Sequence, residues 1–569
     1  MKGEKLKVKG EKHRSRFPLP RSLFFLPFYL SLFTFHLYSQ TIYEPLGSPI
    51  YSYLDRLEAR YGYSLLQFTR PLPRMEIAKV VDSLSRSSVA LMRYDREELA
   101  WYRSEFAEEI VRLARAGGAS EKPDDERWNL VRARGESPAQ GFIAADIVAS
   151  GGYTLRDGAE NVFRRGFGIS AMGYASEYLG ASLRWYDSGV RGLVYDPVAA
   201  RVPEQGIVRG PAKGTTRYDF EVAEGQFTLS LPWLRFGAQK MDLAWGSERE
   251  GNIILSRKVP SFPAVSLQVL LTDWLQFDYF HAWLFSDELD VVVSFQPPEG
   301  TADQYQVFAN KYLSAHAITA RIHPNLQIAL GETMVYSGGP VNLLFLIPVM
   351  PFRAADRWTR ATTGNAQIFA DIRYSPIQRL TLYGTGYIDE LDYSKILAAD
   401  KTKFDYHVAY SVGAMAADLS TALIPFASET RLEFSRVYPY AYTNPKPIQR
   451  YTSHNVIMGH WIGPNADVVT LSHTVHPDRG WDVTGRLSYA RFGQVDMFLE
   501  EGDRIQPAFL YNHDYSRLTI HGALRFRPLH GLSLNLFGEY VKNSEGTDFT
   551  GSPVPEGLSL GGIFSYGLE

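Results

Sequence analysis

Apolar and polar residues alternate with a period of two from about residue 140 to the end of the chain. The alternation is clearest over 518–527, and it resumes over 532–540 after the tight connection 528–531. Successive side chains of a strand point to opposite faces, so this pattern predicts a β-hairpin with one apolar and one polar face. The apolar face holds Leu518, Ile520, Leu524, Phe526, Leu532, Leu534, Leu536 and Tyr540, and the polar face holds Thr519, His521, Arg525, Arg527, Ser533, Asn535 and Glu539.

The same arrangement occurs over 367–374, which turns at Ser375-Pro376 and returns over 380–389. Short returns and long polar connections follow one another along this part of the chain. Short turns at one end and long loops at the other are typical of a transmembrane β-barrel. The other short returns are at 231–233, 271–273 and 323–325, and the long stretches are 187–217, 296–306, 390–404 and 439–455.

We expect a closed barrel and not an open sheet, because lipid cannot satisfy the hydrogen bonds of an open sheet edge. Roughly 430 residues, at about 10–11 per crossing plus unequal loops, suit about 16–20 antiparallel strands. A soluble sandwich or propeller also alternates, and the periodicity alone does not separate these folds. The last expected strand, 558–568, ends in Leu568-Glu569 rather than in the C-terminal aromatic residue of many such barrels.

Residues 48–116 follow a helical period instead, with apolar residues three or four positions apart. We expect three amphipathic helices: one that begins at Ser48-Pro49, one over 73–86, and one from Asp95 to near Gly117. Helices this short bury little surface by themselves, so they should pack on one another and on a further element. The polar stretch 117–138 is interpreted as a linker.

The first 39 residues are interpreted as a cleaved signal peptide. A basic stretch is followed by the apolar stretch 22–38 and by Ser39-Gln40, with a small residue at a plausible cleavage position. The alternative is a retained membrane anchor, but the apolar stretch has 17 residues and contains Pro27 and His36. The sequence therefore predicts export.

The charge and composition of the chain exclude several classes of protein. Subtracting the 8 basic and 2 acidic residues of 1–39 from totals of 59 and 62 leaves 51 and 60, a net charge of −9. An acidic chain without a basic cluster is a poor candidate for nucleic acid binding. The absence of cysteine excludes disulfides, Cys-based zinc sites and thiol catalysis. The 14% aromatic content suits a membrane barrel.

Enzyme signatures are missing from the chain. There is no His-Glu-x-x-His and no phosphate-binding glycine loop, and the one Gly-x-Ser-x-Gly run, 557–561, lies in the last expected strand and not at a strand-to-helix elbow. His473 and His476 would lie on opposite faces of a strand, so they are not expected to share a metal ion. We therefore expect no enzyme activity, no cofactor and no metal, although dispersed catalytic residues would escape a motif search.

Residues 233–268 contain a strand that leads into Trp245-Gly246, then a Gly-rich acidic loop, and then Pro260 and Pro263 around Phe262. This region resembles the capsule-assembly Wzi family of outer-membrane proteins, in which a strand ends in a Trp-Gly loop before a Leu-Ser strand and a double-Pro segment. The resemblance extends in order over nearly all of the mature chain. The other matching segments are 45–62, 70–84, Glu105-Phe106 with Glu109, Gly331-Glu332 with Tyr336, 365–371, 451–452 and 459–467.

This resemblance implies an all-β transmembrane β-barrel of about 18 antiparallel strands with a small N-terminal α-helical bundle. The expected organisation is a signal peptide (1–39), a helical bundle and linker that block the periplasmic side (40–138), and an outer-membrane barrel (139–569). The family implies a non-enzymatic lectin that attaches capsular or other surface polysaccharide to the cell. We expect the protein to be a monomer. Its partners would be polysaccharide and outer-membrane lipid.

Two other functions stay open at this stage: an outer-membrane diffusion porin for sugars or small solutes, and a barrel hydrolase. For the lectin, sugars are expected to meet aromatic faces, carboxylates and amides. An inward-packed loop is the alternative for Trp245, and an ion pair of Asp371 with Arg373 inside the barrel is the alternative for Asp371. The candidate polysaccharide-binding residues, all within segments that resemble the family, are Trp245, Arg257, Glu332, Asn365 and Asp371.

Overall fold

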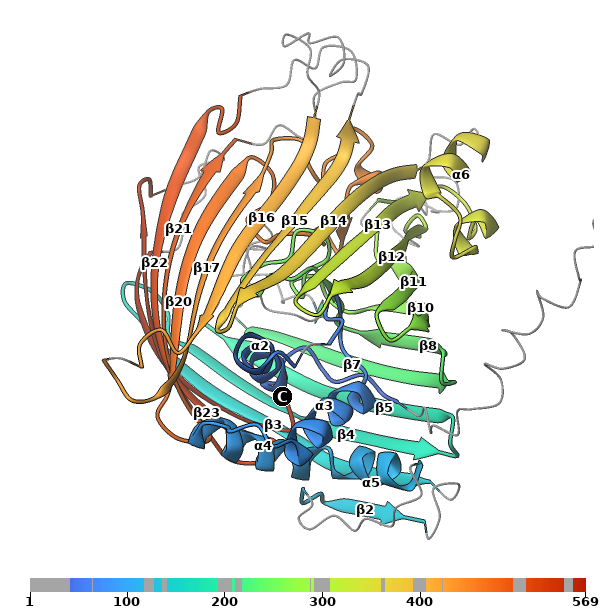
Figure 1. The fold of residues 1–569 in the computed structure, drawn as a ribbon. Helices are drawn as coiled ribbons and strands as arrows, with labels where there is room; N and C mark the ends of the chain where they lie inside the picture. The colour runs from blue at the N-terminus through green and yellow to red at the C-terminus, as the bar shows by residue number, and fades with distance from the viewer. Residues whose placement is uncertain are drawn as a thin grey trace, which may run out of the picture. The chain divides into compact units, whose positions relative to one another are not determined.

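The computed structural model describes most of the chain after residue 40 (Figure 1). The described residues are 41–568 without 64, 117–126, 136–140, 193–206, 210–216, 287, 291–306, 360–363, 392–405, 422, 495–507 and 547–555. The expected signal peptide lies outside them. No helix of the described part is long and apolar enough to cross a membrane.

Eighteen antiparallel strands form one closed β-barrel, as the sequence predicted. The ring closes where β24 pairs with β3, with Tyr566 opposite Ala149. The short strands β2 (Val131–Arg134) and β6 (Ile207–Arg209) pair with β3 and β7. The barrel strands are β3 (Phe142–Arg156), β4 (Val162–Ala175), β5 (Leu179–Arg191), β7 (Arg217–Ser230), β8 (Leu234–Met241), β10 (Phe262–Thr272), β11 (Leu275–Leu284), β12 (Lys311–His323), β13 (Leu326–Ser337), β14 (Gly364–Ile377), β15 (Leu380–Leu391), β16 (Tyr406–Ala417), β17 (Ala427–Val437), β20 (Ala466–His476), β21 (Trp481–Gly493), β22 (His513–Leu529), β23 (Leu532–Asn543) and β24 (Gly557–Tyr566).

The alternation along each strand separates an outer apolar face from an inner polar face. On β14, Ile372 is 46% exposed on the outside, whereas Asp371 and Arg373 are 4% exposed and face the lumen. The expected hairpin near the C-terminus is confirmed as β22 and β23, with Leu524 opposite Leu536. Because one residue of slip would reverse every face, the apolar pattern fixes the register of the wall.

The connections alternate in length around the ring. One end of the barrel, here called the short-turn end, carries tight turns such as 324–325, 378–379, 477–480 and 530–531. The opposite end, the long-loop end, carries the long connections between β8 and β10, β11 and β12, β13 and β14, and β17 and β20. This is the arrangement that the sequence predicted for a transmembrane barrel.

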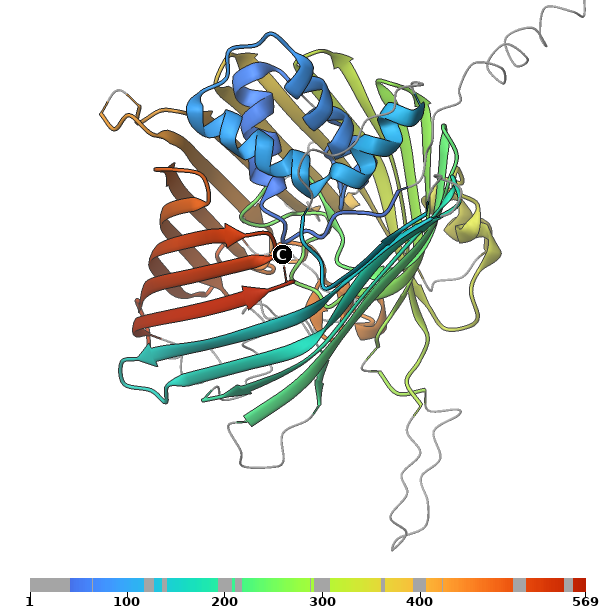
Figure 2. The same ribbon diagram turned by 90° about the horizontal axis from the view of Figure 1, so that it is seen from below.

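Four N-terminal helices pack around one apolar cluster (Figure 2): α2 (Ile50–Tyr61), α3 (Arg74–Arg86), α4 (Arg93–Glu105) and α5 (Ala107–Ala116). The prediction of one helix from Asp95 to near Gly117 is wrong, because that helix breaks at Phe106. The Arg74 guanidinium donates to the backbone carbonyl of Glu105 at 3.1 Å. A side chain that takes a carbonyl out of the helical ladder is an ordinary cause of a kink.

These helices contact the short-turn end of the barrel at several turns. The Arg379 backbone N–H donates to the Ala59 carbonyl at 2.5 Å. On α4, Glu98 pairs with Arg527 at 2.9 Å, and the Trp101 ring stacks on His530 with centroids 3.6 Å apart. The helical bundle is therefore fixed to the wall by backbone, ionic and aromatic contacts together.

Two connections from the long-loop end, 242–261 and 438–465, fold inward and bury apolar side chains within the barrel. Ile253, Ile254, Tyr442 and Met458 are at most 1% exposed and belong to one apolar cluster with inward residues of the wall. In addition, β1 (Thr69–Arg70), which follows α2, pairs with β9 (Ala244–Trp245) of the first connection. The helical bundle and the inward loops therefore form one continuous assembly.

Candidate functional site

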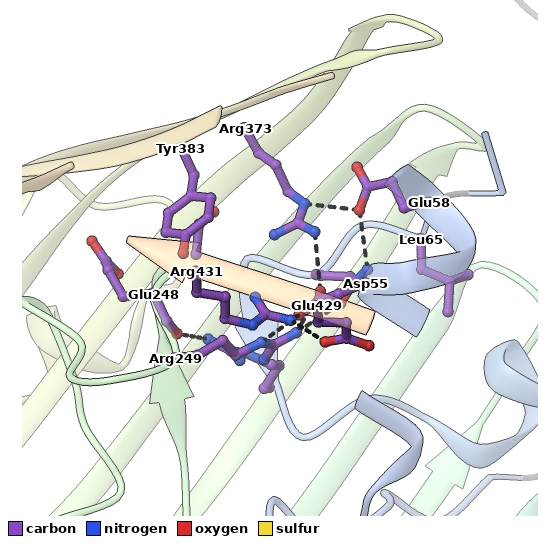
Figure 3. A network of polar contacts seen from close by, with 12 residues as sticks. Asp55, Glu58, Leu65, Glu248, Arg249, Arg373, Tyr383, Glu429 and Arg431 are labelled. Atoms are coloured by element: carbon purple, nitrogen blue, oxygen red, sulfur yellow. Dashed lines mark hydrogen bonds and ion pairs between the residues drawn. The ribbon is translucent and has the colours of Figure 1, made fainter. Parts of the chain in front are cut away.

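A buried ionic network joins helix α2 to the barrel wall and to the first inward loop (Figure 3). The Asp55 carboxylate is fully buried and lies 2.7 Å from Arg249, 3.0 Å from Arg373 and 2.9 Å from Arg431. Arg373 comes from β14 and Arg431 from β17, whereas Arg249 belongs to the loop. One carboxylate therefore ties three separate parts of the molecule together.

The charge of Asp55 follows from this environment. Burial by itself raises its pKa, but the guanidinium groups of Arg249, Arg373 and Arg431 outweigh burial and hold the pKa well below its usual range. Nearby, Glu58 accepts a hydrogen bond from Arg373 at 2.8 Å. Since a buried charge needs a partner, this cluster is stable only while all of its members are present.

The loop after β9 brings a second buried carboxylate close to the wall. Asp371 accepts hydrogen bonds from the Ser247 hydroxyl at 2.8 Å and the Thr385 hydroxyl at 2.7 Å. Glu248 beside it is fully buried, and burial together with the charge of Asp371 raises the pKa of Glu248 to about 8. Asp371 therefore holds the loop in the lumen, and Glu248 favours its protonated form at neutral pH.

The two inward loops are also bonded to each other. The Tyr442 hydroxyl donates to the Ile253 carbonyl at 2.6 Å, and the Ser256 hydroxyl donates to the Gly459 carbonyl at 2.6 Å. A Cβ atom on Gly459 would lie 2.4 Å from the Tyr442 ring. Glycine is therefore required where the loops meet.

A cavity of about 120 Å³ lies beside these loops at the long-loop end, and we name it the long-loop cavity. It combines ring faces with carboxylate, amide, hydroxyl and cationic groups, a mixture that suits a sugar with both apolar and hydroxyl surfaces. Its lining is Phe285, Ser286, Glu288, Lys311, Tyr442, Thr443, Pro447, Ile448, Arg450, Thr452, Asn455, Ile457 and Pro464.

Contacts within the lining hold the long-loop cavity in shape. The Lys311 ammonium donates to the Thr452 hydroxyl at 3.1 Å. The Phe285 ring stacks on His454 with centroids 4.3 Å apart and planes 5° from parallel. Burial lowers the pKa of His454 to about 4, so this ring is neutral at pH 7. Burial also lowers the pKa of Arg450, and the charge of Glu288 offsets part of that effect.

The opposite part of the lumen, along β3, β4, β5 and β7, is less filled. A cavity of about 170 Å³ lies there against residues 42–49 of the N-terminal segment. Arg184 of β5 pairs with Glu224 of β7 inside it, and their side chains are 19% and 11% exposed. Arg257 also lines this cavity, 3.7 Å from the Asp242 carboxylate. Water therefore reaches charged side chains within the barrel on this side.

The five predicted polysaccharide-binding residues lie in separate environments. Trp245 is 4% exposed and packs among Phe68, Phe280 and Phe369, as the inward-packing alternative predicted. Arg257 lies at the larger cavity, and its side chain is 55% exposed.

Asp371 holds the inward loop through Ser247 and Thr385. The predicted ion pair of Asp371 with Arg373 is replaced by separate partners, because Arg373 bonds to Asp55 and Glu58 instead.

The remaining two predicted residues, Asn365 and Glu332, contact other parts of the molecule. Asn365 donates to the backbone carbonyl of Gln449 at 3.3 Å, directly before Arg450 of the long-loop cavity. Glu332 is on the outer face of β13 and accepts a hydrogen bond from the Phe352 backbone at 2.7 Å. No contact in the structure tests sugar binding by any of the five, and their roles stay predictions.

None of the residues of the long-loop cavity was predicted from the sequence as a sugar contact. They come from two connections that are more than a hundred residues apart, between β11 and β12 and between β17 and β20, and no motif links them. The signal that existed was local: 451–452 and 459–467, which resemble the Wzi family, contain Thr452 and Pro464 of the cavity lining. Asp55 was equally hidden, because its partners Arg373 and Arg431 are 318 and 376 positions away.

Comparison with known proteins shows similarity in fold only. No protein-family model matches the chain, and no curated protein matches its sequence. Among solved structures, the chain is similar to Wzi of Escherichia coli, an outer-membrane protein involved in group 1 capsule assembly and a carbohydrate-binding β-barrel. The match has a TM-score of 0.56 at 12% identity and covers 93% of this chain and all of Wzi.

Two further solved structures match over 74% of this chain. They are OccAB1 of Acinetobacter baumannii, with a TM-score of 0.43 at 10% identity over 96% of its length, and OprD of Pseudomonas aeruginosa, with 0.38 at 12% over 94%. These values establish a similar barrel fold for the Wzi match, and the two weaker matches add no argument.

Proposed function

We propose that this chain is an exported outer-membrane protein that binds capsular or other surface polysaccharide and attaches it to the cell, without enzymatic activity. In this proposal, residues 1–39 are a cleaved signal peptide and the short-turn end faces the periplasm, as short turns do in bacterial barrels. The helices of 40–138 then close the periplasmic side, and the long-loop cavity faces outward.

The observation that carries the proposal is the position of the long-loop cavity above the part of the lumen that the inward loops fill. Beneath it, the inward loops and β1 form a buried apolar assembly that continues to the helical bundle. A site placed at the end of a closed barrel favours a surface-binding role over transport. The fold similarity to the carbohydrate-binding Wzi barrel supports the same conclusion.

Within this site we assign the first contacts with sugar to Lys311, Glu288, Arg450 and Asn455. Two cations and one carboxylate favour a glycan that carries both hydroxyl and acidic groups, such as a uronic acid polymer. Phe285 supplies an aromatic edge at the same cavity.

The test is a pull-down of purified surface polysaccharides and a glycan array with the full barrel. We expect binding by the wild-type protein, a loss of at least tenfold in affinity for Arg450→Ala with Lys311→Ala, and a preference for acidic glycans. Arg96→Ala is the control, because Arg96 is an exposed arginine on α4. This helix contacts the short-turn end of the barrel, whereas the cavity lies at the long-loop end. Equal binding by the double variant and the control would reject this site, and no glycan binding at all would reject the function.

A diffusion porin for sugars or small solutes is the second candidate, and one observation favours it. The cavity along β3, β4, β5 and β7 shows that the lumen is not filled on every side. A porin predicts that liposomes containing the protein swell in iso-osmotic sugar solutions. A surface-binding protein predicts no swelling beyond that of empty liposomes.

A further inference from the structure

The outer wall of the barrel has an unusual patch near the long-loop end of β11, β12 and β13. A lipid-facing wall normally presents apolar side chains. Here the outward side chains include His281, His316 and Glu332, together with Tyr279, Tyr312, Ser314 and Tyr336. Lower on the same strands the outer face is ordinary, with Ile318 50% and Leu330 59% exposed. The polar patch therefore occupies only one end of an otherwise apolar wall.

The connection between β13 and β14 covers this patch. Its 3₁₀ helix η3 (Leu343–Leu346) and its helix α6 (Phe352–Thr359) lie outside the barrel next to β12 and β13 (Figure 1). The Phe345 carbonyl accepts hydrogen bonds from Tyr279 at 2.8 Å and from Ser314 at 3.2 Å. The Phe352 backbone donates to Glu332 at 2.7 Å.

Further contacts complete this cover. The His281 ring lies 2.8 Å from the Tyr336 hydroxyl, which in turn accepts from the Asn342 backbone at 3.3 Å. His281 is fully buried and Tyr336 is 3% exposed. The polar side chains of the wall thus serve as attachment points for the connection, which explains why they stand on an outward face.

The outside of this connection is strongly apolar. Leu343 is 74% exposed, Val349 73% and Trp358 85%, and Ile347 adds a further 41%. On α6, Arg353 and Arg357 accompany Trp358. Tryptophan and arginine beside exposed aliphatic residues are typical of helices that lie at a membrane interface.

We propose that the segment 342–359 is a lateral membrane-interface element that binds phosphorylated lipid of the outer leaflet. Leu343, Ile347 and Val349 insert among acyl chains, Trp358 lies at the headgroup level, and Arg353 and Arg357 reach the lipid phosphates. This inference rests on the membrane placement in the proposed function.

Two observations favour lipid as the occupant of this surface. The exposed apolar residues continue the apolar outer face of the neighbouring strands, where Leu330 and Ile372 are exposed. The arginines also supply charge complementary to phosphate, which a purely apolar protein contact would not need. Water is the least suitable medium, because it would leave the exposed Leu343, Val349 and Trp358 side chains solvated together.

The test uses spin labels, since the chain has no cysteine and every introduced cysteine is unique. Val349→Cys reports on the segment, Ile372→Cys on the barrel wall, and Leu423→Cys, a site 90% exposed in a connection of the short-turn end, on water. The labelled full-length proteins are placed in phosphatidylcholine vesicles with and without phosphorylated lipid A. Accessibility to oxygen and to a water-soluble nickel complex is then measured.

We expect the label at 349 to match the label at 372, with high oxygen and low nickel accessibility. Lipid A should lower nickel accessibility at 349 further, and Arg353→Gln with Arg357→Gln should abolish this response. Nickel accessibility at 349 equal to that at 423 would overturn the proposal, because the segment would lie in water. Protection from both reagents at 349 would overturn it in favour of a second protein copy.

The label at 372 separates this proposal from the proposed function. If 372 is exposed to lipid and 349 is not, only the lateral element is rejected. If 372 is itself exposed to water, the membrane placement of the barrel fails, and both proposals fail with it. An equal response of the double arginine variant and the wild type to lipid A would reject the phosphate contact.

Discussion

The two sides of the lumen wall differ in what their inward side chains meet. Along β10–β17 and β20, here called the packed side, inward residues are almost completely buried: Gln367 is 0%, Tyr387 1% and Val437 0% exposed. Along β21–β24 and β3–β5, the hydrated side, Arg486 and Glu539 have side chains that are 42% exposed. Both sides carry charged residues, so composition does not explain the difference.

The cause is the position of the inserted elements. Helix α2, β1 and the two inward loops bind the packed side through Asp55, Asp371 and Tyr442, and they leave the hydrated side open to water. A charge on the packed side has fixed partners and a large effect on stability. A charge on the hydrated side is screened, and its removal has a small effect. The comparison thus predicts which substitutions matter before any is made.

The largest effect is expected for Asp55→Asn on the packed side. The substitution leaves Arg249, Arg373 and Arg431 without their common carboxylate, and breaking a buried pair costs about 3–5 kcal/mol. The measurement is the free energy of unfolding in urea from phosphatidylcholine liposomes. A loss below about 1 kcal/mol, the range of exposed ion pairs, would show that the network does not hold the packed side together.

Gly459→Ala is expected to have the next largest effect, because its new Cβ would meet the Tyr442 ring at 2.4 Å and the Ile253 carbonyl at 2.7 Å. Overpacking of this kind costs about 1–3 kcal/mol. The control is Gly485→Ala on β21, where nothing lies within 4 Å of the new Cβ. Thermal unfolding, followed by the shift of folded barrel on unheated gels, should rank Gly459→Ala clearly below the control.

The stability of the packed side should also depend on pH through Glu248. Its pKa is raised from 4.5 in the unfolded chain to about 8 in the folded protein. The folded state therefore holds the proton more tightly, so stability is complete below pH 4.5 and falls as the pH rises towards 8.

The check for this pH effect is Glu248→Gln, which mimics the protonated carboxyl group. The difference in free energy of unfolding between this variant and the wild type should grow in the variant's favour from pH 4.5 to pH 8. Parallel pH profiles of the two proteins would contradict the assignment of this dependence to Glu248.

The smallest effect is expected for Glu539→Gln on the hydrated side. Glu539 lies 3.4 Å from His521, but their side chains are 42% and 23% exposed. Exposed pairs of this kind contribute about 0–1 kcal/mol. A destabilisation in the same urea titration as large as that of Asp55→Asn would remove the distinction between the two sides.

Much of the barrel could be predicted from the sequence, because period-two alternation depends only on neighbouring residues. Ile372 and Tyr374 on the outside and Asp371 and Arg373 on the inside of β14 are confirmed by their exposure. The same parity also indicated the outward position of Glu332, which shares its face with Ile328 and Leu330. The prediction of Glu332 as a polysaccharide contact came from the resemblance to the Wzi family alone, and it stays a prediction.

The parts that escaped prediction depend on distant contacts. The helix break at Phe106 follows from the contact of Arg74 with the Glu105 carbonyl, and no Gly or Pro marks it in the sequence. The packed and hydrated sides differ in the exposure of their inward side chains, because helix α2, β1 and the two inward loops lie against the packed side. Alternation predicts that Arg373 and Arg486 both face inward. It contains no information about Asp55, which pairs with Arg373 and not with Arg486.

The central claim is that the inserted helices and loops close the barrel, so that it binds polysaccharide at its surface and does not transport solutes. The most direct test is the conductance of the purified full-length protein in planar lipid bilayers. The account predicts no steady channels for the wild type and channel openings for Asp55→Asn, in which the inserted elements are released. Steady open-channel conductance of the wild-type protein would contradict it.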